Sequence, residues 1–406
     1  MTRAPSPPSP PAAGYARPRT IRGLRPILAL KDLEPAARRL LPRSIFGFVT
    51  GGTEDERALA ASGAAFADYA FTTRVLADVS GRRQSVELLG GSFASPFGIA
   101  PMGGIGFGAF EGDLALARAA RSDGIPFVLS ASSLVPMERI AAADPEAWFQ
   151  TYLLEDRPEL DRILDRAAAA GFRVLVVTVD IPVPGNRENN IRNGYNMPLR
   201  FTPRLVFDFA AHPRWLIGTA VRSWLAAGLP HFENQGSRRL PVVSRGPSII
   251  EPRDRIDWDD FAYARRRWAG RLVVKGILSA DDAARAEAAG ADAVIVSSHG
   301  GRQLDSSVAP LRVLSAVVDR VRGIPVLYDG GIRRGSDVLK ALALGAAFTF
   351  VGRPYFLAAA LAGEAGGRHV TRILRDEVDR NLALLGATGL ADLPARLVRA
   401  DGAPVR

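Results

Sequence analysis

From Ser95 onward, the sequence alternates short runs of β-branched and aromatic residues with longer stretches rich in Ala, Arg and Leu. This alternation is typical of parallel strands that are covered by helices. The expected strands span residues 97–102, 126–131, 148–153, 174–180, 272–276, 293–298, 325–331 and 348–353. Eight strands with helices between them predict an α/β fold, a single (β/α)8 TIM barrel.

The segments outside this alternation define the rest of the organisation. Residues 1–25 are rich in Pro, Ser and Ala, which predicts a disordered arm. Residues 26–94 are expected to form an N-terminal helical extension, and residues 95–390 the barrel. Residues 198–260 interrupt the barrel as a long insertion after the fourth strand, and residues 391–406 are expected to form a C-terminal tail. No apolar run reaches the roughly 18 residues that would indicate a membrane-spanning helix.

Charge and cysteine content bear on the class of protein. The formal net charge is +10, and the basic excess lies in residues 1–43 and 200–255, so the remainder is close to neutral. No zinc-finger spacing, RNA-recognition signature or basic zipper accompanies these segments, and nucleic acid is therefore not an expected partner. The chain has no cysteine, which excludes disulfides, thiolate metal ligands and thiol catalysis. We expect a cytoplasmic protein and no metal site.

Polar or conformationally special residues stand where each expected strand ends. In (β/α)8 barrels the active site forms at the carboxyl ends of the strands, whereas core-facing strand residues are apolar. The residues expected at this rim are Pro101, Met102, Gly103, Ser130, Gln150, Tyr152, Thr178, Asp180, Lys275, Ser297, His299, Asp329, Gly352 and Arg353. The sequence thus predicts one functional site to which all eight strands contribute.

Several rim residues indicate charge and proton chemistry. Lys275 lies in an apolar strand of a chain that otherwise uses arginine almost throughout, which indicates a need for a compact positive charge. A carboxylate at Asp180 needs a partner, and the imidazole of His299 is the natural one, because the pair would stabilise the imidazolium form. His299 taken alone fits a structural histidine equally well. Asp329 fits either a cap of the turn that follows it or a ligand contact.

The last two strand ends predict a phosphate site. TIM barrels often bind phosphate with the loops after strands seven and eight, through backbone N–H groups and a helix N-terminus. The residues that supply these parts are Gly330, Gly331, Arg333, Gly352 and Arg353. No GxGxxG fingerprint of a nicotinamide-binding unit follows the first strand, so the phosphate is expected to belong to a flavin or to a sugar phosphate.

Longer motifs carry a family resemblance from about Leu41 to Arg380. They are "LPRSIFGFVTGGTEDE", "QTYLLEDR", "VTVDIPVPGNRENNIRNGY", "LVVKG", "SSHGGRQLD", "DGGIRRGSDVLKALALGA" and "VGRP". In these stretches the chain resembles the FMN-dependent α-hydroxy acid dehydrogenases and oxidases. "HPRW" and "GDLALARAARSDGIPFVLSASS" are most similar to the mandelate dehydrogenase branch.

The resemblance implies a role for each matching residue. His299 would act as the base that Asp180 orients, and Arg302 would pair with the substrate carboxylate. Tyr152 would bond the substrate hydroxyl, Arg187 would support the carboxylate, and Lys275 would lie beside flavin N1. The isoalloxazine would be lined by Pro101, Met102, Ser130, Gln150 and Thr178. The ribityl phosphate would be held by Asp329, Arg333, Gly352 and Arg353.

The sequence departs from the family pattern at the substrate side. The family usually has a tyrosine that helps to grip the carboxylate, and Phe48 stands at that position here. Losing one hydrogen bond to a charged group typically costs about 1.5–3 kcal/mol. Ser298 replaces the asparagine that usually precedes the histidine, which is a smaller change.

These expectations combine into FMN-dependent oxidation of an L-2-hydroxy acid, of the lactate or mandelate type, to the 2-oxo acid. Electrons would pass from FMN to a quinone, a cytochrome or oxygen, and the expected assembly is a homotetramer. The alternatives are a flavin-binding barrel with lost turnover and an FMN barrel enzyme for a phosphorylated or isoprenoid substrate.

The insertion leaves two interpretations open. In residues 200–255, apolar residues alternate with Arg200, Arg204, Arg214 and Arg222, a pattern found in segments that lie in a membrane interface. An anionic membrane surface would then be a partner, with the protein peripheral on the inner membrane. An active-site lid, packed on the barrel or on a neighbouring subunit, explains the same pattern.

Overall fold

The computed structural model describes residues 22–195, 198–236, 239–243 and 253–405. The arm predicted at residues 1–25 therefore lies, apart from its last four residues, outside the described residues. The barrel strands are β4 (Phe97–Ile99), β5 (Val128–Ser130), β6 (Trp148–Tyr152), β7 (Val174–Thr178), β10 (Arg271–Ile277), β11 (Ala293–Val296), β12 (Val326–Asp329) and β13 (Phe348–Val351). Each falls on one of the eight expected runs.

The eight strands form one parallel sheet in the order β4-β13-β12-β11-β10-β7-β6-β5. A parallel bridge between Ile99 and Phe127 joins the first strand to the residue before the second, which closes the sheet into a barrel. Alternate residues point to opposite faces, so Val176 packs in the barrel interior with Trp148 and Phe350, whereas Val177 packs beneath the helices. The predicted (β/α)8 barrel is confirmed.

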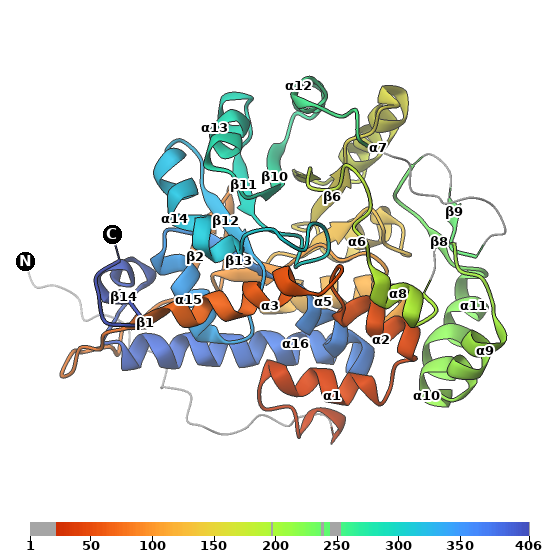
Figure 1. The fold of residues 1–406 in the computed structure, drawn as a ribbon, viewed down its shortest axis with the longest axis horizontal. Coiled ribbons are helices and arrows are strands. Elements are labelled where there is room, and N and C mark those ends of the chain that lie inside the picture. The colour runs from red at the N-terminus through yellow and green to blue at the C-terminus, as the bar shows by residue number, and fades with distance from the viewer. Residues whose placement is uncertain (1–21, 196–197, 237–238, 244–252, 406) are drawn as a thin grey trace, which may run out of the picture.

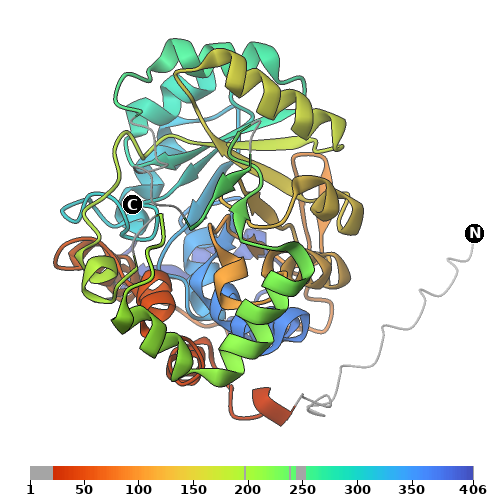
Figure 2. The same ribbon diagram turned by 90° about the vertical axis from the view of Figure 1, so that its right-hand side faces the viewer.

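Helices surround the strands (Figure 2). They are α5 (Gly112–Asp123), α6 (Met137–Ala143), α7 (Arg157–Ala169), α12 (Trp258–Arg267), α13 (Ala280–Ala288), α14 (Pro310–Arg320), α15 (Gly335–Ala343) and α16 (Arg353–Leu384). Side-chain caps start several of them, as when Asp156 accepts a hydrogen bond from the Glu159 N–H at the beginning of α7. Helix α16 is kinked at Ala362 and Gly363, which have non-helical dihedral angles.

The N-terminal extension wraps one side of the barrel. It contains α1 (Leu33–Arg38), α2 (Arg43–Thr50) and α3 (Arg57–Ala64), and α1 lies against α16 (Figure 1). The hairpin β2 (Val86–Leu88) and β3 (Gly91–Phe93) adds two side chains to the barrel interior. Strand β1 (Tyr69–Phe71) pairs antiparallel with β14 (Leu397–Arg399), which ties the extension to the C-terminal end.

The insertion after β7 is largely helical where the structure describes it. Helix α8 (Glu188–Arg192) precedes the insertion. The insertion contains α9 (Pro203–Ala210), α10 (Pro213–Trp215), a π-helical turn (Leu216–Val221) and α11 (Arg222–Ala227), followed by β8 (His231–Phe232) and β9 (Leu240–Pro241). The buried Trp215 donates its indole N–H to the Phe107 carbonyl at 2.8 Å, and this contact fixes the segment on the barrel. Asp208 accepts from the backbone N–H of Arg43 at 3.2 Å, at the start of α2.

Candidate active site

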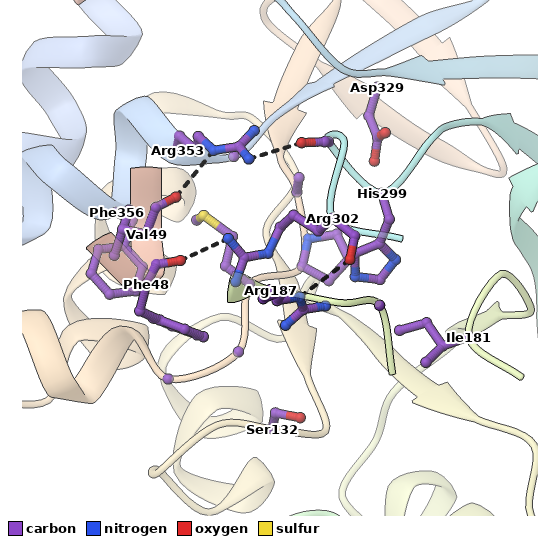
Figure 3. Close-up of a pocket in the computed structure, with 18 of the residues that line it drawn as sticks. Phe48, Val49, Ser132, Ile181, Arg187, His299, Arg302, Asp329, Arg353 and Phe356 are labelled. Atoms are coloured by element: carbon purple, nitrogen blue, oxygen red, sulfur yellow. Dashed lines mark hydrogen bonds between the residues drawn. The ribbon is translucent and has the colours of Figure 1, made fainter. Parts of the chain in front are cut away.

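A cavity of about 740 Å³ opens at the carboxyl ends of the strands. Figure 3 shows residues from the extension, the barrel loops and the segment after β7 converging on it. The predicted site residues that line it are Pro101, Met102, Gly103, Tyr152, Arg187, Lys275, His299, Arg302, Asp329, Gly330, Gly331, Arg333, Gly352 and Arg353. The structure therefore brings most of the predicted site together.

The other predicted residues do not line this cavity, and most of them lie just beneath its wall. Ser130 donates to the Gln150 side-chain oxygen at 3.0 Å, and both residues are buried. Ser297 accepts a hydrogen bond from Lys275, and Asp180 contacts His299. Thr178 is one of the residues that line a second, smaller cavity. Ser297 and Asp180 thus affect the site indirectly, because they position the side chains of Lys275 and His299.

His299 and Asp180 form a hydrogen-bonded pair, with the imidazole Nδ1 2.9 Å from the carboxylate Oδ1. Burial alone would raise the pKa of Asp180, but the attraction of His299 and Lys275 lowers it overall. Burial lowers the pKa of His299 below 6.5, against the opposing effect of Asp180. At neutral pH the pair is therefore a carboxylate and a neutral imidazole, with Nδ1 as the donor and Nε2 left as a proton acceptor.

The backbone around His299 has an unusual conformation. His299 has a φ of +54°, and Gly300 and Gly301 follow with φ of +66° and +70°. A left-handed backbone is unfavourable for a residue with a side chain and tends to persist only where the surroundings enforce it. Here the Ser297 hydroxyl accepts the His299 N–H at 3.0 Å. The turn that follows β11 thus fixes where the imidazole lies.

Gly276 makes room for the carboxylate behind the imidazole. It has a φ of +108°, and a Cβ at this position would lie 2.5 Å from the Asp180 Cγ. The register of β10 against β11 also shifts here, between Lys275 and Ile277. Because only glycine fits both the dihedral angle and the space, the placement of Asp180 depends on a residue of the neighbouring strand.

Lys275 is a buried cation with two polar partners. Its Nζ lies 3.1 Å from an Asp329 carboxylate oxygen and donates to the Ser297 hydroxyl at 3.0 Å. Burial alone would lower the pKa of Lys275, but Asp329 and Asp180 outweigh it and raise the pKa. The lysine therefore stays charged although its side chain is almost fully buried, which places a permanent positive charge in the cavity wall.

Two arginines are held by the C-terminal end of α2. Arg302 donates to the carbonyls of Phe48 and Gly51 at 2.7 and 2.9 Å, and Arg353 donates to those of Val49 and Gly51 at 3.0 and 3.1 Å. The last carbonyls of a helix carry the negative end of its dipole, which favours cations there. Figure 3 shows these bonds to Phe48 and Val49, and shows Arg187 bonded to the Arg302 carbonyl.

The cavity carries more buried positive than negative charge. Burial and the neighbouring Arg187 and Arg353 lower the pKa of Arg302 well below its usual value. Burial and the neighbouring Arg333 lower the pKa of Arg353 to about 10. Within the described residues, none of these four guanidiniums forms an ion pair with a carboxylate. Such a cluster is costly alone and fits anionic ligands.

The two ends of this cluster suit different anions. Arg333 and Arg353 lie with Gly331 and Gly352 on the loops after β12 and β13, the place where TIM barrels bind phosphate. Gly331 has a φ of +74°, and a Cβ there would lie 2.1 Å from the Ser62 carbonyl oxygen, so no other residue fits this turn. Arg302 and Arg187 lie with His299, where a carboxylate could bind beside the base. The donor set therefore fits a phosphorylated flavin and a carboxylate ligand together.

Sequence reasoning missed several residues of the cavity wall. They are Phe107, Ser132, Tyr195, Phe232, Gln235 and Arg253. Gln235 donates to the Ser132 hydroxyl at 2.6 Å, and the Arg253 guanidinium lies 4.3 Å from the centre of the Tyr152 ring. Tyr195, Gln235 and Arg253 lie in loops away from the barrel strands, so no strand pattern marked them. The only available signal for Tyr195 was its place in the motif that ends in "NNIRNGY".

Comparison with known proteins decides the family. The profile of the FMN-dependent dehydrogenases matches residues 37–400. This chain belongs to the FMN-dependent dehydrogenase family. It is 38% identical over 381 residues to a putative L-lactate dehydrogenase of Mycobacterium tuberculosis, covering 93% of this chain and 90% of that protein. It is 36% identical over 376 residues to the (S)-mandelate dehydrogenase of Pseudomonas putida, covering 92% and 94%.

A solved structure agrees with this membership. The crystal structure of a monotopic membrane protein, (S)-mandelate dehydrogenase, matches with a TM-score of 0.84 and 35% sequence identity. The match covers 92% of this chain and 99% of that one. As a member of the FMN-dependent dehydrogenase family, this protein is an oxidoreductase with FMN as its cofactor, which confirms the predicted class and cofactor.

Proposed function

We propose that this FMN-dependent dehydrogenase oxidises an L-2-hydroxy acid to the 2-oxo acid. One observation carries the proposal: a neutral histidine, held by a buried carboxylate, shares a cavity with two arginines that have no carboxylate partner among the described residues. A base beside a carboxylate-binding pair suits a substrate whose carboxylate is next to the carbon that is oxidised. The relatives are named as a putative L-lactate dehydrogenase and an (S)-mandelate dehydrogenase, which supports the same substrate class.

The side chains have complementary roles in this proposal. Arg302 and Arg187 bind the carboxylate, and the hydroxyl of Tyr152 bonds the substrate hydroxyl. His299 Nε2 accepts a substrate proton, and Asp180 stabilises the resulting imidazolium because its charge lies 2.9 Å from the ring nitrogen. Bound FMN supplies the acceptor for the two electrons that leave the substrate carbon.

The cofactor is assigned to the other half of the cavity. The positive charge of Lys275 lies where it would favour an anionic flavin ring, and Arg333 and Arg353 would hold the phosphate with Asp329. The ring is assigned to the wall formed by Pro101, Met102 and Gly103, with Ser130, Gln150, Thr178 and Ser297 nearby, and Gly331 and Gly352 are assigned to the phosphate end. This division leaves Arg302 and His299 free for substrate.

Anaerobic reduction of the purified flavoprotein tests the proposal. A panel of 2-hydroxy acids, with lactate and mandelate as the first probes, should bleach the flavin absorbance, and the L enantiomer should react faster than the D enantiomer. Phosphorylated sugars are the comparison, since the rival FMN enzyme would use a phosphorylated substrate. If no 2-hydroxy acid bleaches the flavin, the proposal is wrong. Reoxidation with a quinone, cytochrome c and oxygen then identifies the electron acceptor.

We also infer that the inserted helices α9–α11 lie on a membrane surface, on the cytoplasmic side of the inner membrane. These helices expose Phe207, Ile217, Trp224 and Leu225, with exposed fractions of 76%, 67%, 58% and 73%. Large side chains of this kind are rarely grouped on a surface that faces only water. Arg214 is among the exposed arginines that accompany them, as an anionic lipid surface would favour.

The opposite side of the segment is anchored, which leaves the apolar side available. Leu205 and Trp215 are buried against the protein, and the Phe209 and Trp215 rings pack 4.8 Å apart. Figure 1 shows α9–α11 at the edge of the molecule, beside α2 and away from the barrel strands. In the described part of the chain no helix combines the length and apolarity needed to cross a membrane. A peripheral attachment is consistent with that, and a relative is described as monotopic.

Sedimentation with vesicles tests the membrane proposal. The intact protein should sediment with phosphatidylglycerol vesicles at low salt and should be only partly released at high salt, because apolar contacts resist screening. If it stays in the supernatant at both salt concentrations, the apolar surface is a lid or a subunit contact instead. Light scattering on the same sample tests the predicted homotetramer.

A further inference from the structure

Phe48 and Tyr195 are a stacked aromatic pair in the wall of the cavity. Their ring centres lie 4.3 Å apart with an angle of 20° between the planes. Phe48 stands where the family usually has a tyrosine that grips the substrate carboxylate. The chain therefore lacks a hydroxyl at residue 48 but carries one on Tyr195, whose ring stacks on Phe48.

Tyr195 is held firmly in this place. Its backbone N–H donates to the Asn190 carbonyl at 2.8 Å, and Gly194 before it has a φ of +79°. The Phe107 ring contacts the Tyr195 ring edge-on at 6.1 Å. The residue is 7% exposed, and it lines the cavity together with Phe48 and Arg302. The ring is thus fixed by contacts on several sides, which leaves its hydroxyl group little freedom.

The surroundings of the Tyr195 hydroxyl are those of a carboxylate-binding site. Arg302 and Arg187 are the charged groups that act on it, and they favour its ionised form although burial raises its pKa overall. The Arg302 guanidinium also lies 4.9 Å from the centre of the Phe48 ring (Figure 3). Among the described residues, no side chain or backbone group bonds the Tyr195 hydroxyl. A hydroxyl on a cavity-lining ring beside two arginines, with no partner among the described residues, is suited to donate to an anionic ligand.

We propose that Tyr195 supplies the hydroxyl that binds the substrate carboxylate in place of the one missing at Phe48. The family has this hydroxyl on α2, at the position of Phe48. Here it lies on the segment after α8, on the ring that stacks against Phe48. The proposal rests on the proposed oxidation of a 2-hydroxy acid, and it assigns to Tyr195 a binding role that Arg302 and Arg187 share. The hydroxyl acts on the bound acid and not on the proton transfer, so its loss should affect binding more than the chemical step.

Tyr195→Phe removes only this hydroxyl and keeps the ring stack. The dissociation constants of pyruvate and benzoylformate, titrated by the change in flavin absorbance, should rise at least about tenfold, as expected for a lost hydrogen bond to a charged group. The KM for the reactive 2-hydroxy acid should rise similarly, with the limiting rate of flavin reduction changed less than about threefold. Tyr263→Phe is the matched control, because its hydroxyl bonds Asp161 outside the cavity. It should leave both constants unchanged.

An exchange of the two residues gives the decisive result. The variant Phe48→Tyr/Tyr195→Phe returns the hydroxyl to the family position and should recover most of the affinity that Tyr195→Phe loses. Retained FMN and an unchanged circular dichroism spectrum show that each variant is folded. If Tyr195→Phe binds both oxo acids within twofold of the wild-type protein, the proposal is wrong. Absence of flavin reduction in the wild-type protein would instead refute the proposed function.

Discussion

The strand-end cavity and the inserted helices α9–α11 differ in opposite ways from most of the protein. The cavity takes charged side chains out of water, and the helices leave large apolar side chains in it. The cavity buries Lys275 and partly buries Arg302, which most proteins keep in water, whereas α9–α11 expose Phe207 and Trp224, which most proteins bury. In the cavity, helix carbonyls and carboxylates partly compensate for the buried charge. On α9–α11 no described residue covers the exposed rings. The charge in the cavity is therefore balanced within this chain except for the ligands, whereas the exposed rings on α9–α11 are left for the proposed membrane contact.

His299→Gln is expected to have the largest effect on this comparison. The amide keeps a polar group in the cavity but cannot accept the proton, so FMN should stay bound while flavin reduction slows by at least about two orders of magnitude. Anaerobic stopped-flow measurement with the best 2-hydroxy acid checks the rate. A variant that reduces its flavin at a near wild-type rate would remove His299 from the mechanism. The vesicle binding proposed for α9–α11 should not change.

Gly276→Ala should slow flavin reduction less than His299→Gln does, because it acts on His299 only through Asp180. The new methyl group collides with Asp180, so the rate should fall by roughly ten- to a hundredfold through loss of the oriented pair. Asp180→Asn is the second variant, in case the strained alanine prevents folding. Either change weakens the attraction that raises the pKa of His299. Because activity needs the neutral base, the acidic limb of kcat/KM should lie at lower pH in either variant than in the wild-type protein. An unchanged pH profile would contradict this pairing.

The double variant Trp224→Ser/Leu225→Ser tests the second region. Removing two exposed apolar side chains from α11 should weaken vesicle binding about tenfold or more, since each contributes up to roughly 1.5–3 kcal/mol when fully buried. Leu384→Ser is the matched control, because Leu384 is 64% exposed on α16, outside the insertion. Flavin reduction should stay at the wild-type rate. Equal vesicle binding by the double variant and the control would rule out α11 as the attachment surface.

Phe48→Tyr should have the smallest effect. With Tyr195 already in place, a second hydroxyl should lower the KM for lactate by at most about fivefold, or about 1 kcal/mol. Steady-state kinetics with lactate and mandelate measures the change. A much larger gain would mean that the wild-type cavity lacks this hydrogen bond altogether. A loss for mandelate alone would identify Phe48 as part of the wall that contacts an aromatic substrate.

The sequence predicted the barrel because each strand is marked by a local pattern of residues. It predicted much of the site because the carboxyl ends of all barrel strands lie at one rim. Lys275 and His299 could be placed on one rim without any coordinates. The limits of the strands were less accurate, since the run 325–331 continues beyond β12 into a turn. Tyr195 and Gln235 were not predicted, because their positions depend on the path of the insertion. The stacking on Phe48 joins residues that are distant in sequence, and no local pattern encodes it.

The end of α2 has a consequence for how such a protein can be assembled from parts. Its last carbonyls accept hydrogen bonds from Arg302, after β11, and from Arg353, at the start of α16 after β13. The barrel by itself would keep these cations but lose the carbonyls that stabilise them. The extension is therefore not an exchangeable module. A chimera that joins this barrel to the extension of a distant relative should keep its cofactor only if the turn from Phe48 to Gly51 presents its carbonyls in the same way.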